Sequence, residues 1–203
     1  MYKSFIKRIL DYFFAYFFVL ILLPIYLLVS LAIFVSLGRP VIFKQSRPGL
    51  NGSIFKLYKF RTMKNLYHSS GKKLSDHERM TSVTRLIRSL SLDELPSLYN
   101  VIKGEMSFIG PRPLLLSYLD RYSDFQMRRH EVLPGITGWA QVNGRNSVDW
   151  NKRFEMDIWY IDNYNFLLDL RIIFLTLYKV ITRKDIDQDS KTTMPEFKGD
   201  INE

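Results

Sequence analysis

The most prominent feature of the hydropathy pattern is an apolar run from Tyr12 to Leu37 that carries no charged residue. The run is long enough for a transmembrane helix, which needs about 20 apolar residues. Pro24 lies near its middle, where a proline removes a helical hydrogen bond and clashes with the preceding turn. Each half is then only about 18–20 Å long, shorter than a hydrocarbon core of about 30 Å. The pattern predicts a bent, re-entrant helix, with a kinked spanning helix as the alternative.

Basic residues flank both ends of this run and bear on its topology. Lys3, Lys7 and Arg8 precede it, and Arg39 and Lys44 follow it. Basic residues concentrate at the cytoplasmic ends of membrane segments. Basic flanks on both sides therefore favour a segment that enters and leaves on the cytoplasmic side. Residues 1–38 are predicted to form a re-entrant membrane helix bent at Pro24.

Shorter, mixed segments follow and predict a mostly helical α+β domain over residues 39–185. Two strands, Val41–Gln45 and Ile54–Arg61, are expected to pair as a β-hairpin because turn residues separate them. Apolar residues at helical spacing predict five helices, over Glu78–Leu90, Leu92–Ile102, Leu114–Phe125, Val148–Tyr160 and Leu167–Thr182. The last is bracketed by basic residues, which favours an interfacial amphipathic helix over a core helix. Residues 186–203 are expected to form a polar, loosely ordered tail.

Composition narrows the classes of partner and site. The 203 residues carry a formal net charge of +9, which suits nucleic acid, an anionic membrane face or phosphorylated substrates. The chain has no cysteine, which excludes disulfides and thiolate metal sites. Its three histidines lack paired spacing, so a structural zinc site is not expected. We interpret His130 as a surface or packing residue rather than a general base.

The adjacent acids Asp93 and Glu94 are the most informative polar pair. Ser91 stands three residues before Glu94, so the segment matches a capping box that only stabilises a helix start. The functional interpretation uses the same position, because helix N-termini bind phosphate and a carboxylate there can attack phosphorus. Carboxylate oxygens beside phosphates also suit Mg²⁺. The residues alone leave both interpretations open.

Three further features can contribute to a site. The triplet Pro111-Arg112-Pro113 restricts the backbone on both sides of its arginine. It either presents the forked guanidinium group of Arg112 to a phosphate or forms a rigid surface turn. The glycine-rich segment Pro134–Arg145 could approach a phosphate closely, although it lacks the P-loop pattern. Asp157 is a weaker candidate for substrate binding. Its alternative is a surface acid paired with Arg153, four residues earlier.

Four motifs together resemble the bacterial sugar transferase family, the small monotopic phosphoglycosyl transferases. The resemblance runs in order over nearly the whole chain. The motifs are Lys59-Phe60-Arg61-Thr62-Met63, Ser91-Leu92-Asp93-Glu94-Leu95-Pro96, Gly110-Pro111-Arg112-Pro113 and Pro134–Arg145. The family fold includes a re-entrant membrane helix bent at a proline, which falls here on Pro24. Some relatives have a serine before this proline, where this chain has Leu23. The bend must then depend on Pro24 and on packing.

The resemblance implies an enzyme that moves a sugar 1-phosphate from a UDP-sugar to undecaprenyl phosphate and releases UMP. Its acidic dyad falls on Asp93, the expected nucleophile of a covalent phospho-sugar intermediate, and on Glu94, expected to assist with the metal or the acceptor proton. Mg²⁺ is the expected cofactor, with Asp93 as its protein ligand. The residues expected to bind substrate or phosphate are Lys59, Arg88, Arg112, Arg145 and Asp157.

The resemblance also implies a place in the cell. The enzyme is expected at the bacterial inner membrane, with its catalytic domain on the cytoplasmic face, carrying out the first membrane step of glycan assembly. Membrane lipids are expected partners and nucleic acid is not. The donor is expected to carry an N-acetylated hexosamine derivative. The alternative is a non-catalytic, basic, membrane-anchored binding protein, which explains the charge but not the acidic pair or Pro-Arg-Pro.

Overall fold

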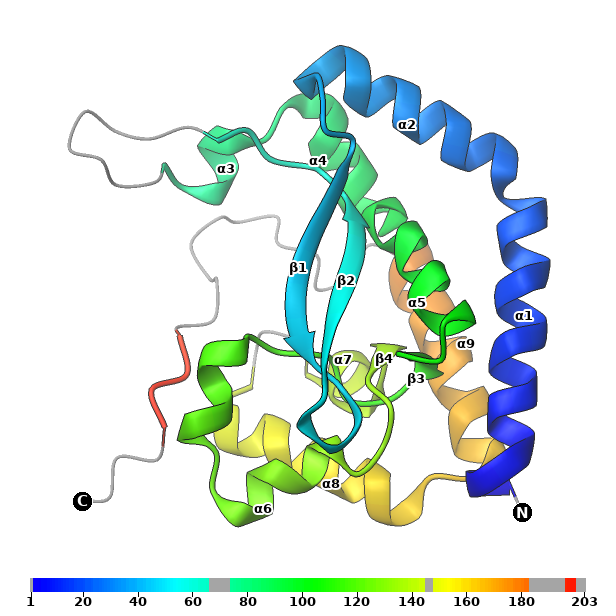
Figure 1. The fold of residues 1–203 in the computed structure, drawn as a ribbon, viewed down its shortest axis with the longest axis vertical. Helices are drawn as coiled ribbons and strands as arrows, with labels where there is room; N and C mark the ends of the chain where they lie inside the picture. The colour runs from blue at the N-terminus through cyan, green and yellow to red at the C-terminus, as the bar shows by residue number, and fades with distance from the viewer. Residues whose placement is uncertain (1, 66–73, 145–147, 183–195, 200–203) are drawn as a thin grey trace.

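The computed structural model describes residues 2–65, 74–144, 148–182 and 196–199. It is mostly helical, with one antiparallel and one parallel pair of strands, which confirms the α+β class. Figure 1 shows the arrangement. The helices and strands in chain order are η1 (Tyr2–Ile6), α1 (Lys7–Ile21), α2 (Leu23–Leu37), β1 (Ile42–Pro48), η2 (Leu50–Gly52), β2 (Ile54–Phe60), α3 (Asp76–Arg79), α4 (Ser82–Ser89), η3 (Leu92–Ser97), α5 (Leu98–Ile102), β3 (Ser107–Ile109), η4 (Leu116–Arg121), α6 (Asp124–Met127), η5 (Arg128–His130), β4 (Gly135–Thr137), α7 (Trp139–Asn143), α8 (Trp150–Asn163) and α9 (Phe166–Thr182).

The apolar N-terminal run forms two helices, α1 and α2, with a bend of 63° between them. Pro24 lies in the first turn of α2, where its missing N–H would have no helical acceptor in any case. Leu22 at the bend donates to the carbonyl of Phe18 and accepts from the N–H of Tyr26, so backbone bonding continues on both sides. Within the described ranges, no single helix is long and apolar enough to cross a membrane, whereas the bent pair passes that test as a unit.

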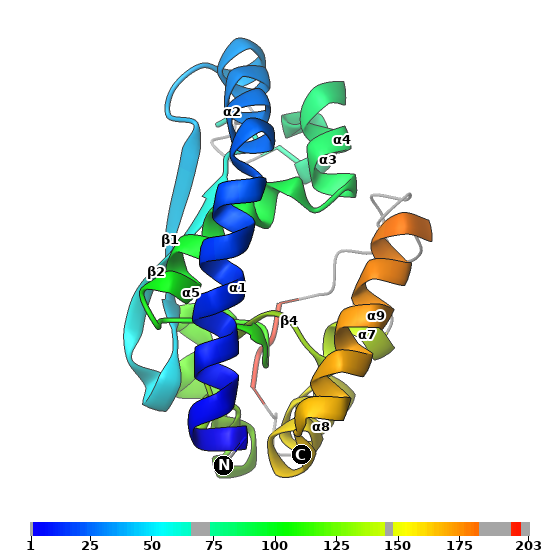
Figure 2. The ribbon, with the colours of Figure 1, turned by 90° about the vertical axis from the view of Figure 1, so that its right-hand side faces the viewer.

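The start of α1 is attached to α9 through one buried carboxylate. Asp169 is 3% exposed and accepts hydrogen bonds from Tyr2, from Lys7 at 2.6 Å and from Tyr160 at 2.7 Å. These bonds connect three segments far apart in the chain. They fix the N-terminal end of α1 beside the junction of α8 and α9, as Figure 2 shows.

Strands β1 and β2 form the predicted hairpin, and a buried amide fastens it to α5. Asn100 is fully buried. Its Nδ2 donates to the carbonyl of Lys56 at 2.7 Å, and its Oδ1 accepts from the N–H of Tyr58 at 3.1 Å. Because these partners are strand backbone groups, Asn100 fixes the position of the hairpin relative to the segment that follows the acidic pair.

Two of the predicted helices are divided by side-chain caps. The expected helix Glu78–Leu90 is two helices, α3 and α4, because the backbone of Thr81 is extended and its side chain caps α4 by accepting from the N–H of Thr84. The expected helix Leu114–Phe125 is a 3₁₀ helix, η4, followed by α6, which Ser123 caps in the same way. Local hydrogen bonds to Ser and Thr side chains therefore override the apolar periodicity.

Helix α9 is two-faced rather than a core helix. Only Asp169 and Ile172 are buried along it. On the other side Leu167, Phe174 and Ile181 are 73%, 62% and 78% exposed. This is the amphipathic pattern that the sequence predicted for an interfacial helix.

The described part of the polar tail, residues 196–199, packs against the domain. Phe197 is 3% exposed, with its ring centroid 5.1 Å from that of Phe154 and 5.6 Å from that of Tyr118. Its carbonyl accepts from Arg121, and its N–H donates to the Tyr118 hydroxyl at 3.2 Å. The expectation of a loosely ordered tail is therefore wrong for these residues, because an aromatic side chain finds a buried cluster.

Candidate active site

The acidic pair lies in η3, directly after a residue in a left-handed conformation. Ser91 has φ 55° and ψ 20°, and its side chain makes no capping hydrogen bond. The predicted capping box is therefore wrong. A left-handed backbone in a residue other than glycine costs about 1–3 kcal/mol, and such strain is common at functional sites. The sharp turn at Ser91 places Asp93 and Glu94 in the first turn of η3.

Glu94 is held by two cations from other parts of the chain. Its Oε1 lies 2.6 Å from Lys59 Nζ, on β2, and 2.6 Å from Arg112 Nη2, in the Pro-Arg-Pro turn. Burial alone would raise the pKa of Glu94, but Arg112 and Lys59 outweigh burial and hold that pKa well below its usual range. Glu94 is therefore a permanent anion that joins the hairpin to the turn.

Asp93 is in the opposite situation. In the described part of the chain its side chain has no ion pair or hydrogen bond. Burial, followed by the negative charge of Glu94, raises the pKa of Asp93, while Lys59, Arg88 and Arg112 partly oppose this. Two neighbouring carboxylates thus have pKa values pushed apart, a mark of acids with different roles. Asp93 is the more basic of the two and the one left available for chemistry.

The glycine-rich motif supports the Pro-Arg-Pro turn. Strands β3 and β4 pair in parallel. Strand β3 ends directly before the Pro-Arg-Pro motif, and β4 lies within the glycine-rich motif. A Cβ on Gly135 would lie 2.1 Å from the nitrogen of Gly110, and one on Gly138 would lie 2.1 Å from its oxygen. Only glycine permits backbones to approach so closely. Gly135 and Gly138 are therefore explained by close packing against the backbone of Gly110, beside the Pro-Arg-Pro turn.

A buried arginine fixes the backbone of Arg112. Arg129 Nη2 donates to the carbonyl of Arg112 at 2.8 Å and to Asp157 Oδ2 at 2.8 Å. The side chains of Arg129 and Asp157 are only 1% and 4% exposed. Asp157 is therefore not a surface acid paired with Arg153, and it contributes to the site through Arg129. Sequence reasoning missed Arg129 because its partners are 17 and 28 residues away and no local pattern marks it.

The other predicted residues fall in three different places. Arg88 is exposed near the end of α4, and its charge acts on Asp93. Arg145 lies outside the described residues. His130 is 5% exposed, with Nδ1 3.0 Å from the carbonyl of Gly49, and burial lowers its pKa to about 4. The interpretation of His130 as a packing residue is confirmed.

The motifs that meet at this site identify the family. The model described as bacterial sugar transferase matches residues 2–183. This chain belongs to the bacterial sugar transferase family. The resemblance inferred from the motifs is thereby confirmed over nearly the whole chain.

Similar proteins carry names from this family. The chain is 50% identical over 194 residues to the uncharacterized sugar transferase EpsL of Bacillus subtilis (strain 168), with 96% of each protein covered. It is 38% identical over 189 residues to the UDP-glucose:undecaprenyl-phosphate glucose-1-phosphate transferase of Escherichia coli (strain K12), covering 88% of this chain and 41% of that one. It is 41% identical over 165 residues to the undecaprenyl-phosphate galactose phosphotransferase of Salmonella typhimurium (strain LT2), covering 73% of this chain and 34% of that one.

The extent of these matches differs. The chain matches EpsL almost end to end but spans less than half the length of the other two relatives. The names agree with the predicted class, a transferase of phosphorus-containing groups, and not with a non-catalytic binding protein.

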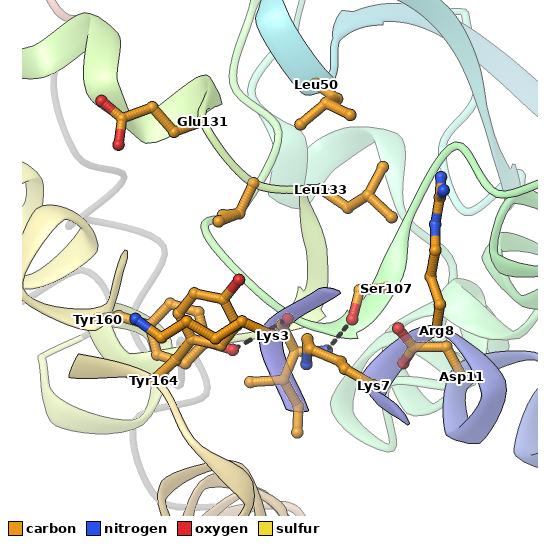
Figure 3. Close-up of a pocket in the computed structure, with 12 residues that line it drawn as sticks. Lys3, Lys7, Arg8, Asp11, Leu50, Ser107, Glu131, Leu133, Tyr160 and Tyr164 are labelled. Carbon is orange, nitrogen blue, oxygen red and sulfur yellow. Dashed lines mark hydrogen bonds between the residues drawn. The ribbon is translucent and has the colours of Figure 1, made fainter. Parts of the chain in front are cut away.

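A pocket of about 190 Å³, lined by both charged and apolar residues, lies at the start of α1. Figure 3 shows Lys3, Lys7 and Asp11 along its wall. Lys7 is bound to Asp169, and Asp11 accepts the N–H of Phe108 at 3.1 Å. The acidic pair does not line it. We therefore assign these charges to anchoring α1 rather than to the reaction.

The substitution Asp157→Asn is expected to destabilise the fold by about 3–5 kcal/mol, because it leaves a buried arginine without its counter-ion. Thermal unfolding in detergent measures this effect. The matched control is Asp162→Asn on the same helix, whose ion pair with Arg128 is exposed and should matter little. Equal unfolding midpoints for the two variants would contradict the structural part assigned to Asp157.

Proposed function

We propose that this protein transfers a sugar 1-phosphate from a UDP-sugar to undecaprenyl phosphate and releases UMP. The observation that carries the proposal is the contrast between the two acids, one bound by Lys59 and Arg112 and the other left unpaired in the described structure. Such a pair, with cations on either side, suits attack on a phosphorus whose oxygens need neutralising. The names of the E. coli and Salmonella relatives support the same reaction class.

The reaction is proposed to proceed in two displacements. An Asp93 oxygen attacks the β-phosphorus of the UDP-sugar, the bond from that phosphorus to the bridging oxygen breaks, and UMP leaves with the electron pair. An oxygen of undecaprenyl phosphate then attacks the same phosphorus and displaces the carboxylate. The products are undecaprenyl diphosphate-sugar and free Asp93. Its raised pKa makes Asp93 a better nucleophile than an ordinary carboxylate.

Glu94 is proposed to act as a fixed anion. Sequence reasoning expected it to assist with the metal or to take the acceptor proton. A carboxylate whose pKa is held low by two cations is a weak base. We therefore assign Glu94 to orienting Lys59 and Arg112 toward the phosphates.

Mg²⁺ is proposed as the cofactor, held by Asp93 together with substrate oxygens. Among the residues whose placement is described, no group of three or more His, Cys, Asp or Glu could hold a metal. A single carboxylate fits Mg²⁺, which commonly takes most of its ligands from phosphates and water. When bound, the ion would neutralise charge on the phosphates.

The bent pair α1 and α2 is proposed to enter the bacterial inner membrane from the cytoplasmic face and return to it. Its exposed apolar residues support this, since Phe13, Leu20, Leu28 and Val35 are 61%, 74%, 67% and 76% exposed. Large exposed apolar surfaces indicate a membrane or protein contact. The basic flanks and the apolar face of α9 support a headgroup level on the same side as the active site.

The donor sugar is identified by comparing UDP-sugars as substrates. An N-acetylated hexosamine derivative is our expectation, whereas the names of relatives include glucose, galactose and N-acetylgalactosamine. The test is UMP release by the detergent-solubilised protein from a panel of UDP-sugars, with Mg²⁺ and undecaprenyl phosphate. UMP release that requires all three components supports the proposal, and its absence with every donor contradicts it.

The substitution Asp93→Asn is expected to abolish UMP release and the covalent adduct, because an amide is too weak a nucleophile to attack phosphorus. Intact-protein mass spectrometry after incubation with donor alone detects the adduct. The control is Asp162→Asn, which should retain both activities. An Asp93→Asn variant that still forms the adduct would remove Asp93 from the nucleophile position.

The acidic limb of the pH–rate profile is expected to follow ionisation of Asp93. Its pKa lies above the ordinary range, so the rate should fall as pH decreases through that raised value. Arg88 lowers this pKa, and Arg88→Gln should therefore move the acidic limb to higher pH. Arg85→Gln, one turn earlier on α4, is the matched control. A limb that stays in place or moves to lower pH in Arg88→Gln would contradict the assignment.

The substitution Pro24→Ala is expected to straighten the bent pair and place the two flanks on opposite sides of the membrane in part of the population. The chain has no cysteine, so single cysteines introduced at Phe5 or Ser46 are unique labelling sites. An impermeant thiol reagent should find both positions on the cytoplasmic side in the parent protein. The same result in Pro24→Ala would show that this proline does not decide the topology.

A further inference from the structure

The face of the hairpin that bears Lys59 carries a second cation at its far end. In the β1–β2 pair Phe43 lies opposite Lys59, and Arg47 lies opposite Phe55. Opposed residues project to the same face and alternate residues along a strand do so too, so Lys59 and Arg47 share a face. They are separated by a length of four β1 residues, about 13 Å at 3.3 Å per residue. Lys59 is bound to Glu94. The Lys59 end of this row is therefore the end that lies beside the acidic pair.

No carboxylate in the described part of the chain neutralises Arg47. Its Nη2 donates to Gln45 Oε1 at 2.7 Å, and its Nε is buried without a hydrogen-bond partner among the described residues. Burial, followed by the like charge of Arg112, lowers the pKa of Arg47 to about 10. A guanidinium that is partly desolvated beside another one is stabilised by an anion between them.

Helix α8 adds a third guanidinium to this region. Arg153 lies over the ring of Trp150, with Cζ 5.3 Å from its centroid. Burial, together with the like charges of Arg112 and Arg129, lowers the pKa of Arg153 to about 10, although Asp157 opposes this. The charge of Arg112 acts on both Arg47 and Arg153, so three guanidinium groups lie in one region of the described structure. Several guanidinium groups in one region suit a ligand with more than one negative charge.

The direction of the hairpin distinguishes the two phosphorylated substrates. Figure 1 shows β1 running from the end of α2 toward the opposite end of the domain. The Lys59 end is close to α2, since the rings of Tyr26 and Phe60 are 5.7 Å apart. Arg47 lies at the end away from α2, where its strand partner Phe55 shares a buried cluster with Ala15 of α1. Tyr26 is two residues from Pro24, so the Lys59 end is the one nearer the bend. We therefore assign the lipid phosphate to the Lys59 end and the water-soluble part of the donor to the Arg47 end.

We propose that Arg47, together with Arg112, binds the phosphate of the leaving nucleotide while Asp93 attacks the neighbouring phosphorus. This inference rests on the proposed function and adds to it a binding residue from the hairpin. In this arrangement Lys59 binds oxygens of the phosphate that Asp93 attacks, and Arg112 lies between the two phosphates. Arg47 binds the phosphate that departs as part of UMP. The separation of Lys59 and Arg47, about 13 Å, is long enough for a diphosphate and its attached groups. These would lie beside Arg112, since Phe55 and Leu57 on the same face of β2 are buried in the core.

The experiment measures binding of UDP, UMP and uridine to the detergent-solubilised full chain by calorimetry. Arg47→Gln is expected to weaken UDP and UMP by about tenfold or more, the effect of losing a charged hydrogen bond. Uridine, which has no phosphate, should bind as it does to the parent protein. The matched control Arg128→Gln removes an exposed guanidinium that pairs with Glu131 and Asp162, and it should leave all three affinities unchanged.

A kinetic readout separates this contact from general damage to the site. Arg47→Gln should slow formation of the covalent adduct from the UDP-sugar. It should leave unchanged the transfer of phospho-sugar from preformed adduct to undecaprenyl phosphate, because UMP has already departed. If the glutamine variant unfolds, Arg47→Lys retains the charge without the guanidinium fork. Weaker UMP binding by that variant at an unchanged unfolding midpoint supports the proposal.

Two results would overturn the inference in distinguishable ways. Parent-like affinity for UDP and UMP in Arg47→Gln, in a preparation whose parent protein releases UMP, would overturn the contact alone. A parent protein that binds neither nucleotide and releases no UMP from any donor would overturn the proposed function, and this inference with it. Loss of uridine binding along with UMP binding would assign Arg47 to the general architecture of the site instead.

Discussion

The ion pairs of Glu94 are the interaction on which this site depends. One carboxylate oxygen lies 2.6 Å from both Lys59 and Arg112, and so joins the hairpin, the η3 turn and the Pro-Arg-Pro turn. Each cation would otherwise face its neighbours without a counter-ion, since Lys59 and Arg112 are themselves close enough to repel. A partly buried pair of this kind stabilises through geometry and charge together, and removal of one member leaves an uncompensated charge. The rest of the arrangement is built around this junction.

The same junction divides the roles of two adjacent acids. Because the cations bind Glu94, Asp93 keeps a raised pKa and an unoccupied side chain within the described structure. Two sets of hydrogen bonds hold the segments around Glu94 in position. Arg129 connects Asp157 to the carbonyl of Arg112, and the hydroxyl of Tyr26 on α2 donates to the carbonyl of Leu95 in η3. The hydrogen bond from Tyr26 connects the bent helix pair directly to the segment that carries the acids.

Prediction from the sequence succeeded where the signal was local and failed where partners were distant. The hairpin, the position of the bend near Pro24 and the amphipathic last helix followed from apolar spacing and turn residues. The capping box at Ser91 failed because Glu94 has stronger partners elsewhere, and the backbone at Ser91 turned left-handed instead of capping a helix. The division of residues 78–90 followed from the cap at Thr81, a weaker local signal than the apolar pattern around it.

The sequence by itself determined the family, the reaction class that its motifs imply, and the two carboxylates at which we propose the chemistry to occur, because ordered motifs and adjacent residues are visible along a chain. Only the tertiary structure decided which acid is tied and which is available, since that depends on cations 35 and 18 residues away from Glu94. It also decided that Asp157 is buried on Arg129 and that Arg47 shares a face with Lys59. Charge interactions depend on distance in space, and sequence spacing does not report that distance.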